Sequence, residues 1–207
     1  ISRKTEVRII FSQDIPEEKL QKVQADAIMR LTPKAEGKFA FANNKTLVFT
    51  PAEDLKRDTP YSVKVDLDKL FDKGGTFEFN FRTRPFAIGG SMKSFDETSD
   101  GRYEITYNII TADVEDAKLI DSHLQLSKEC DREWTHAADG LTHQLKARVA
   151  AKTHGKLELT TVQDNTLGIG CKVLATVDLP NPDILTVVST RCKHAETKCI
   201  EITFNKN

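Results

Sequence analysis

The sequence predicts an all-β protein made of tandem antiparallel β-sandwich domains, and three observations support this prediction. Short segments in which apolar and polar residues alternate occur along the whole chain, which is typical of strands with one buried face. One of these segments recurs at an interval of about one hundred residues, the length of a sandwich domain. Segments with the period of a helix are almost absent.

The recurring segment places apolar residues at alternate positions, the last of them aromatic, and adds a small polar residue. Its three copies are Val7–Ser12, Tyr103–Asn108 and Ile200–Asn205. The aromatic residues stand at positions 11, 107 and 204, so they are 96 and 97 residues apart. This interval is far longer than the repeat of a solenoid and suits tandem sandwich domains.

An apolar strand also precedes the second and third copies, at Phe86–Ile88 and Leu185–Val188, which favours a true repeat over the chance recurrence of short strands. The first copy lacks this strand. We therefore expect a first domain over 1–84 without its first strand, and a second domain over 85–180. Residues 181–207 are expected to be the first hairpin of a truncated third domain.

In the first domain, Pro16–Leu20 is expected to form a short helical turn, because proline and acidic residues favour the start of a helix. A strand is expected at Ala27–Leu31, ended by Thr32-Pro33. Asn43-Asn44 predicts a hairpin turn, since asparagine tolerates positive φ. The last strand, Phe77–Arg82, alternates aromatic and polar residues.

Tyr61 opens the alternating strand Tyr61–Val65 shortly after Leu55 and a turn. This arrangement resembles the tyrosine corner of immunoglobulin-like sandwiches, in which the tyrosine hydroxyl binds backbone a few residues upstream. We therefore expect the Tyr61 hydroxyl to fasten the corner before its strand.

The second domain is expected to be a succession of strands joined by turns. Asp139-Gly140 is a strong signal for a two-residue hairpin turn. Pro180–Asp183 is expected to be a linker. The predicted strands are Leu119–Leu126, Cys130–His136, Leu141–Val149, Lys156–Val162 and Lys172–Leu179.

The charge balance argues against several classes of partner. The formal net charge is −1, and lysine and arginine are not clustered, so we expect no binding of nucleic acid or of an anionic membrane surface. No apolar run is long enough to span a bilayer. The chain begins at Ile1 without a signal peptide, as a piece of a longer or processed protein would.

His136 and His143 are the sharpest candidate site. The Asp139-Gly140 turn would place them directly opposite each other, close enough to share a metal ion. Two histidines without a third ligand make a weak site, however. We therefore interpret them as a solvated pair on a β surface and predict no metal ligands.

Other patterns for catalysis or cofactor binding fail. The sequence has no G-x-S-x-G motif, and Gly168-Ile169-Gly170 is too short for a phosphate loop. Asp66–Asp72 has Leu70 and Phe71 where a calcium loop needs a ligand and a glycine. The prediction is that the chain is not an enzyme, that it has no catalytic or cofactor-binding residue, and that it needs no cofactor.

Four cysteines leave the disulfide state open. Cys192 and Cys199 flank the predicted turn Lys193–Lys198, so a bridge between them is possible. Free thiols, or partners in another domain, are equally compatible with the sequence. A bridge between Cys130 and Cys171 has less support, because nothing in the sequence fixes their separation.

The first domain resembles a bacterial immunoglobulin-like domain. Glu6–Ser12, Leu31-Thr32-Pro33, Thr46–Pro51, Leu55–Val65 and Phe77–Thr83 carry this resemblance. Nearly the whole chain is similar to the amino-terminal part of the large alpha-2-macroglobulin-like lipoproteins of Bacteroidetes-type bacteria. Ile1-Ser2-Arg3, Trp134–His143 and Leu157–Thr160 carry this narrower resemblance.

The resemblance implies macroglobulin-like or fibronectin-III-like sandwiches in a lipid-anchored protein of the cell envelope, in the periplasm or at the outer surface. Such proteins entrap proteases after a bait region is cleaved, often with a Cys-Leu-Glu-Gln thioester. Cys199-Ile200-Glu201-Ile202 lacks the required Gln, so no functional residue transfers. The implied role is a structural scaffold of a protease inhibitor, a monomer whose partners are the other domains of the chain and, through them, target proteases.

Two other functions remain open on the sequence. The same modules could be spacer or adhesive repeats of a cell-surface or surface-layer protein. They could also be an accessory module of an enzyme, but one Trp and three Tyr provide little of the aromatic surface such a module uses to bind its target.

Overall fold

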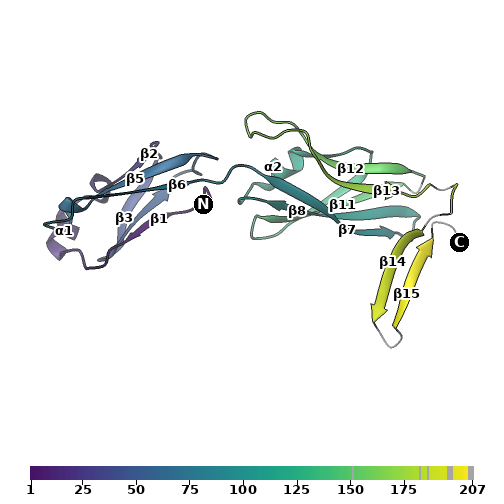
Figure 1. The fold of residues 1–207 in the computed structure, drawn as a ribbon, viewed down its shortest axis with the longest axis horizontal. Coiled ribbons are helices and arrows are strands. Elements are labelled where there is room, and N and C mark those ends of the chain that lie inside the picture. The colour runs from purple at the N-terminus through teal and green to yellow at the C-terminus, as the bar shows by residue number, and fades with distance from the viewer. Residues whose placement is uncertain (151, 182, 186, 195–197, 205–207) are drawn as a thin grey trace. The chain divides into compact units, whose positions relative to one another are not determined.

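The computed structural model describes residues 1–150, 152–181, 183–185, 187–194 and 198–204. The chain divides into two compact units, Ile1–Pro85 (unit 1) and Phe86–Asn207 (unit 2). Both units are built from antiparallel strands (Figure 1). Among the described residues, each unit has a single α-helix, which is six residues long. The predicted all-β fold is therefore confirmed.

Unit 1 is a sandwich of two three-stranded sheets, ordered β1-β4-β3 and β2-β5-β6. Apolar side chains of both sheets share one core, for example Phe49 of one sheet and Val63 of the other, each 0% exposed. The strands are β1 (Val7–Ile10), β2 (Met29–Thr32), β3 (Gly37–Asn43), β4 (Thr46–Pro51), β5 (Pro60–Asp66) and β6 (Thr76–Arg82). The helices are α1 (Glu17–Lys22) and the 3₁₀ turns η1 (Ala25–Ala27) and η2 (Leu67–Lys69).

The corner that leads into β5 is closed by Tyr61. Its hydroxyl accepts a hydrogen bond of 3.1 Å from the Lys56 backbone N–H, and the side chain is 2% exposed. Thr83, which follows β6, donates its hydroxyl to the Lys56 carbonyl at 2.6 Å and accepts from the Thr59 N–H at 3.0 Å. The predicted tyrosine corner is confirmed, and Thr83, which follows the residue of β6 that pairs with Pro60, fastens the same corner.

Unit 2 has a four-stranded sheet, β10-β11-β8-β7, and a three-stranded sheet, β13-β12-β9. A separate hairpin, β14–β15, follows them in the chain. The strands are β7 (Ile88–Glu97), β8 (Arg102–Thr111), β9 (Leu124–Leu126), β10 (Asp131–His136), β11 (Thr142–Ala150), β12 (Gly155–Thr161), β13 (Val173–Leu179), β14 (Val187–His194) and β15 (Lys198–Phe204). The helix is α2 (Ala117–Ser122).

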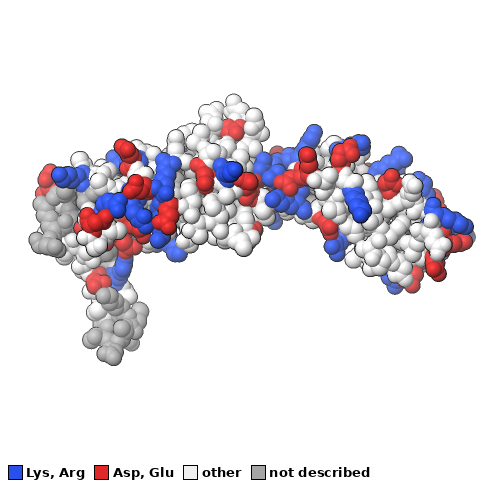
Figure 2. Space-filling model, turned by 180° about the vertical axis from the view of Figure 1, so that it is seen from behind, with Lys and Arg blue, Asp and Glu red and all other residues white. Residues whose placement is uncertain are grey.

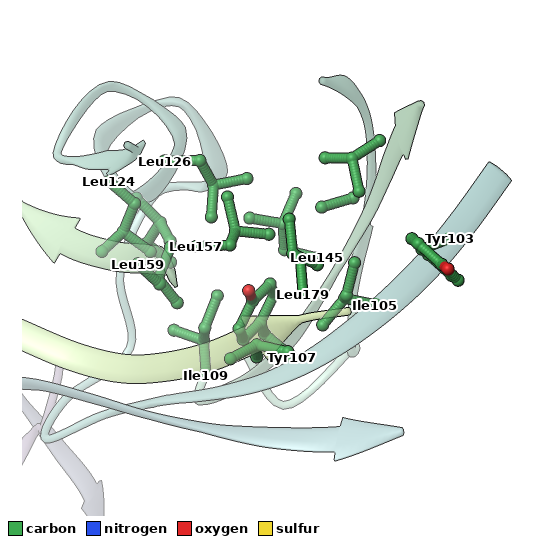
Figure 3. Packing of buried hydrophobic residues seen from close by; sticks show 14 residues of the cluster. Tyr103, Ile105, Tyr107, Ile109, Leu124, Leu126, Leu145, Leu157, Leu159 and Leu179 are labelled. Atoms are coloured by element: carbon green, nitrogen blue, oxygen red, sulfur yellow. The ribbon is translucent and has the colours of Figure 1, made fainter. Parts of the chain in front are cut away.

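The core of unit 2 lies between its two larger sheets. Tyr103, Ile105 and Tyr107 project inward from β8, because alternate residues of a strand share one face. Leucines of the opposite sheet, among them Leu157 and Leu159, belong to the same cluster and lie on the side of Tyr107 (Figure 3). The recurring segment of the sequence is therefore the central core strand of this unit.

The structure corrects two expected strands of unit 2. Residues 119–126 were expected to be one strand, but they contain the end of α2 and then the short β9. The cause is Asp116, whose carboxylate accepts a hydrogen bond from the Lys118 N–H at 2.8 Å and so caps the helix. The strand expected at residues 86–88 instead begins at Ile88 and continues to Glu97 as β7.

Candidate functional site

The candidate site lies at the tip of the β10–β11 hairpin. Gly140 has a positive φ of 64° and donates its N–H to the Ala137 carbonyl at 3.0 Å. Asp139 Oδ1 accepts from the N–H groups of Leu141 and Thr142 at 2.8 and 2.9 Å. These contacts fix the turn, and the resulting register places His136 opposite His143, as the sequence predicts.

The two imidazole rings are in direct contact. Their Nδ1 atoms are 3.0 Å apart, and the ring centroids are 5.1 Å apart. Ala137 donates to the Thr142 carbonyl, so the neighbouring His136/His143 pair is a non-hydrogen-bonded pair, in which side chains approach most closely. A hydrogen bond between two Nδ1 atoms needs one donor and one acceptor, so at least one ring is neutral when the contact forms.

His143 is buried, with 1% of its surface exposed. It shares the inner face of β11 with Leu145 and Ala147, which are buried to the same degree. The interpretation of the pair as solvated on a β surface was therefore wrong. Two-residue alternation along β11 puts position 143 on the core face, at the edge of the sandwich.

The surroundings of the pair are partly polar. Trp134 stacks on His136 with a centroid distance of 5.6 Å, and the Nε2 of His136 lies 3.4 Å from Asp121 Oδ1 of α2. His143 Nε2 is buried without a hydrogen-bond partner among the described residues. Burial lowers the pKa of His143, and the nearby His136 lowers it further, although Asp139 and Asp121 act in the opposite direction.

The geometry does not gather these groups around one point. His136 faces His143 with Nδ1 and Asp121 with Nε2, so its two neighbours lie at different edges of the ring. Within the described part of the chain, no group of three or more His, Cys, Asp or Glu residues is arranged to hold a metal ion. What the arrangement can do is hold the tip of the hairpin against α2 through a buried, proton-sensitive contact.

A second histidine, His123, is partly buried and has no signal in the sequence. His123, at the end of α2, places Nε2 2.9 Å from Asp164 Oδ2 and Nδ1 2.7 Å from the Leu119 carbonyl. Asp164 also accepts hydrogen bonds from the N–H and hydroxyl of Thr166, and these contacts and His123 hold the pKa of its carboxyl well below the usual value. The contact between His123 and Asp164 fastens the loop before β13 to the end of α2.

The cysteines are free thiols in this structure. Cys192 lies opposite Ile200, and Cys199 lies opposite Lys193. Neighbouring register positions project to opposite faces of a hairpin, so Cys192 and Cys199 point away from each other. The bridge that the sequence allows is therefore not formed, and residues 195–197 of the predicted turn lie outside the described residues.

Charged side chains of unit 2 pair on the outer face of its larger sheet. Arg148 contacts Glu104 at 2.8 Å and Glu133 at 3.0 Å, and Arg102 contacts Asp131 at 2.8 Å. On the side of the molecule seen in Figure 2, residues of both signs are interspersed. Such exposed pairs contribute little individually and leave no extended field of one sign.

Residues 1–83 match the family of the bacterial Ig-like domain. No curated protein matches the chain. None of the helices in the described residues is long and apolar enough to cross a membrane.

Among solved structures, the chain is similar to L,D-transpeptidase 3 from Mycobacterium tuberculosis in complex with a faropenem-derived adduct, with 18% identity and a TM-score of 0.32. This match covers 51% of the chain and 39% of that protein. A second similar structure, an L,D-transpeptidase from Mycobacterium tuberculosis H37Rv, has 13% identity and a TM-score of 0.31, over 98% of the chain and 70% of that protein.

These comparisons correct one expectation. The sequence was interpreted as that of a protein that is not an enzyme, but the similar solved structures are L,D-transpeptidases, which are enzymes. The likeness, at TM-scores near 0.3, transfers no active-site residue. The family match is local to the first unit: residues 1–83 match the bacterial Ig-like domain.

Proposed function

We propose that the chain is a scaffold segment of a longer protein of the bacterial cell envelope, in which Ig-like sandwiches hold and space other domains. The match of residues 1–83 to the bacterial Ig-like domain carries this proposal. Domains of this family occur in extracellular or surface proteins of bacteria.

The internal construction of unit 1 supports a load-bearing role. The Tyr61 hydroxyl and Thr83 both fasten the backbone at Lys56, so the start of β5 and the end of β6, which pair with each other, are tied to one corner. The Arg84 N–H donates to the Ile1 carbonyl at 2.9 Å. The first residue is thus held beside the end of β6.

The more specific function we propose is that of a scaffold in an alpha-2-macroglobulin-like, lipid-anchored protease inhibitor. It rests on the sequence resemblance carried by Ile1-Ser2-Arg3, Trp134–His143 and Leu157–Thr160. In such a protein the segment would be monomeric, would contact the neighbouring domains of its own chain, and would meet proteases through the intact protein. The same modules would also suit a spacer in an adhesive or surface-layer protein.

The test uses the full-length protein, incubated with a broad-specificity protease. That protease is then assayed on a small peptide and on a large protein substrate. A steric trap leaves cleavage of the peptide intact and abolishes cleavage of the protein. If both activities are unchanged, the protease-trap function is excluded and the spacer function takes its place.

A matched control is the chain 1–207 alone, at the same molar concentration. We expect it to leave both activities of the protease unchanged, because a scaffold segment cannot enclose a protease by itself. Loss of protein cleavage with this chain alone would contradict the scaffold assignment.

A further inference from the structure

The hairpin β14–β15 resembles the hairpin β7–β8 in its strand pairing as well as in its sequence. Residues 200–204 of β15 correspond to residues 103–107 of β8 at the 97-residue interval. In β7–β8, the pairing shifts between Met92 and Ser94, across from Thr106 and Tyr107. In β14–β15, it shifts between Val187 and Ser189, across from Thr203 and Phe204. A bulge at the equivalent place marks the two hairpins as copies of one structural unit.

The equivalent side chains differ sharply in exposure. In β8, Tyr103, Ile105 and Tyr107 are 3%, 0% and 0% exposed. Their counterparts in β15, Ile200, Ile202 and Phe204, are 66%, 51% and 45% exposed. The same face that forms the centre of a core in β8 is therefore uncovered in β15.

The two faces of β14–β15 differ in character. Ile200, Ile202 and Phe204 lie across from Cys192, Thr190 and Val187, and together they form one largely apolar face. On the other face, Arg191 of β14 forms an ion pair with Asp96 of β7. The hairpin thus contacts the rest of unit 2 through Arg191 and through Val188, which packs against the core of that unit. It leaves the apolar face to solvent, where a monomeric protein rarely keeps such a patch.

In unit 2, a sheet covers this face of the first hairpin. Leucines of β12, Leu157 and Leu159, are 0% exposed and pack in one cluster with Ile105 and Tyr107 of β8. They belong to the sheet β13-β12-β9, which follows the β7–β8 hairpin in the chain. The repeat therefore indicates what kind of surface the apolar face of β14–β15 fits.

We propose that the face formed by Val187, Thr190, Cys192, Ile200, Ile202 and Phe204 is half the core of a third Ig-like sandwich. Its occupant is a β-sheet with an alternating aliphatic inner face, supplied by the polypeptide that follows residue 207 in the natural protein. A second copy of this hairpin fits less well. Two hairpins would give two strands in each sheet, whereas the sandwiches of units 1 and 2 have three or four.

The test compares hydrogen exchange at the amides of β15 in the chain 1–207 and in the natural full-length protein. Exchange is expected to slow at least about 100-fold in the full-length protein, because a hairpin that joins a packed sandwich opens only with that domain. The amides of β12 in unit 2 serve as an internal reference and are expected to be protected equally in both proteins. Equal exchange of β15 in both proteins would overturn the proposal.

Variants separate the apolar face from the hairpin itself. In the full-length protein, Ile202→Ser combined with Phe204→Ser is expected to return β15 to the fast exchange of the short chain and to leave β12 unchanged. The matched control is Thr203→Ala, on the opposite face of the same strand, which is expected to preserve the protection of β15. Loss of protection in the control to the same extent as in the double variant would show that the apolar face has no special partner.

A separate measurement tests whether a second copy of the chain covers the apolar face. Sedimentation velocity of the chain 1–207 is expected to show a monomer across the accessible concentration range. A dimer that disappears in the Ile202→Ser, Phe204→Ser variant would assign the face to a second copy of the chain and overturn the proposed third sandwich.

Discussion

His136 and His143 contact each other through their Nδ1 atoms at 3.0 Å, at the edge of a core in which His143 is 1% exposed. The contact joins β10 to β11 near the tip of their hairpin, where the two histidines are paired. Asp121 of α2 lies at the other edge of the His136 ring. Because one ring must accept the hydrogen bond, protonation of both rings breaks the contact and places two positive charges side by side.

Unit 2 is therefore expected to lose stability in mild acid. Burial and His136 lower the pKa of His143 in the folded state, whereas the unfolded chain returns it to about 6.5. At a pH between the lowered pKa of the folded state and the ordinary pKa of the unfolded state, the unfolded state binds more protons than the folded state. The free energy of unfolding therefore increases with pH in this range. The contribution is complete above about pH 6.5 and is lost as the pH falls below it, with a loss on the order of 1 kcal/mol for each unit by which the pKa is lowered.

Trp134, the sole tryptophan of the sequence, stacks on His136 and reports on this unit. Urea unfolding followed by its fluorescence is expected to show a lower midpoint at about pH 5.5 than at about pH 7.5. His143→Gln should reduce this difference, and the exposed His154→Gln should leave it unchanged. An equal pH dependence in all three proteins would show that other groups cause it.

The tyrosine corner predicts a difference between two Tyr→Phe substitutions. Tyr61→Phe removes the acceptor of the Lys56 N–H and is expected to destabilise unit 1 by about 1 kcal/mol. Tyr107→Phe removes a buried hydroxyl that has no partner among the described residues, so we expect no loss of stability in unit 2.

Calorimetry of the two variants measures both effects in the same chain. The transition of unit 1 is expected to move down by several degrees in Tyr61→Phe, while that of unit 2 stays in place. Equal effects of both substitutions would mean that the Tyr61 hydrogen bond contributes nothing beyond the packing of the ring.

The features that the sequence predicts correctly are those with a local signature. Tyr61 follows Leu55 and a turn, and Asp139-Gly140 is a turn signal, so both the corner and the register of His136 against His143 follow from neighbouring residues. The β fold follows from two-residue alternation in the same way. Helix α2 also had a local signal, the capping Asp116, which its apolar residues obscured.

The remaining features depend on contacts between distant residues. The His123–Asp164 pair joins positions 41 residues apart, and no motif spacing links a histidine to an aspartate over that distance. The burial of His143 was available from its alternation with Leu145 and Ala147, but its polarity favoured the surface. The bulge shared by β7–β8 and β14–β15 is a property of pairing and cannot be read from one strand.

The hairpin register makes a prediction about the thiols. Cys192 and Cys199 occupy neighbouring register positions on opposite faces, so mild oxidation is expected to leave both open to alkylation. Peptide mapping by mass spectrometry would measure this directly. A bridge between Cys192 and Cys199 would require the pairing to slip by one residue, which would also turn Ile200 and Ile202 to the other face.

Gly37 is expected to be intolerant of any side chain. A Cβ at this position would lie 2.5 Å from Cε2 of Phe49 and 2.5 Å from the Thr50 carbonyl oxygen. The Phe49 ring is 0% exposed and packs at 4.6 Å from that of Phe39, so it has no space into which to move. Gly37→Ala should therefore destabilise unit 1 by about 1–3 kcal/mol.

Gly89→Ala is the matched control, because the nearest atom to its added Cβ is the Ile110 carbonyl oxygen at 4.0 Å. It is expected to change the stability of unit 2 by less than about 0.5 kcal/mol. Calorimetric midpoints of the two variants, compared with the unchanged chain, distinguish a steric effect from a general cost of replacing glycine in a strand. Similar losses in both variants would show that the cost is the general one of replacing glycine in a strand, and that the close approach at Gly37 adds nothing to it.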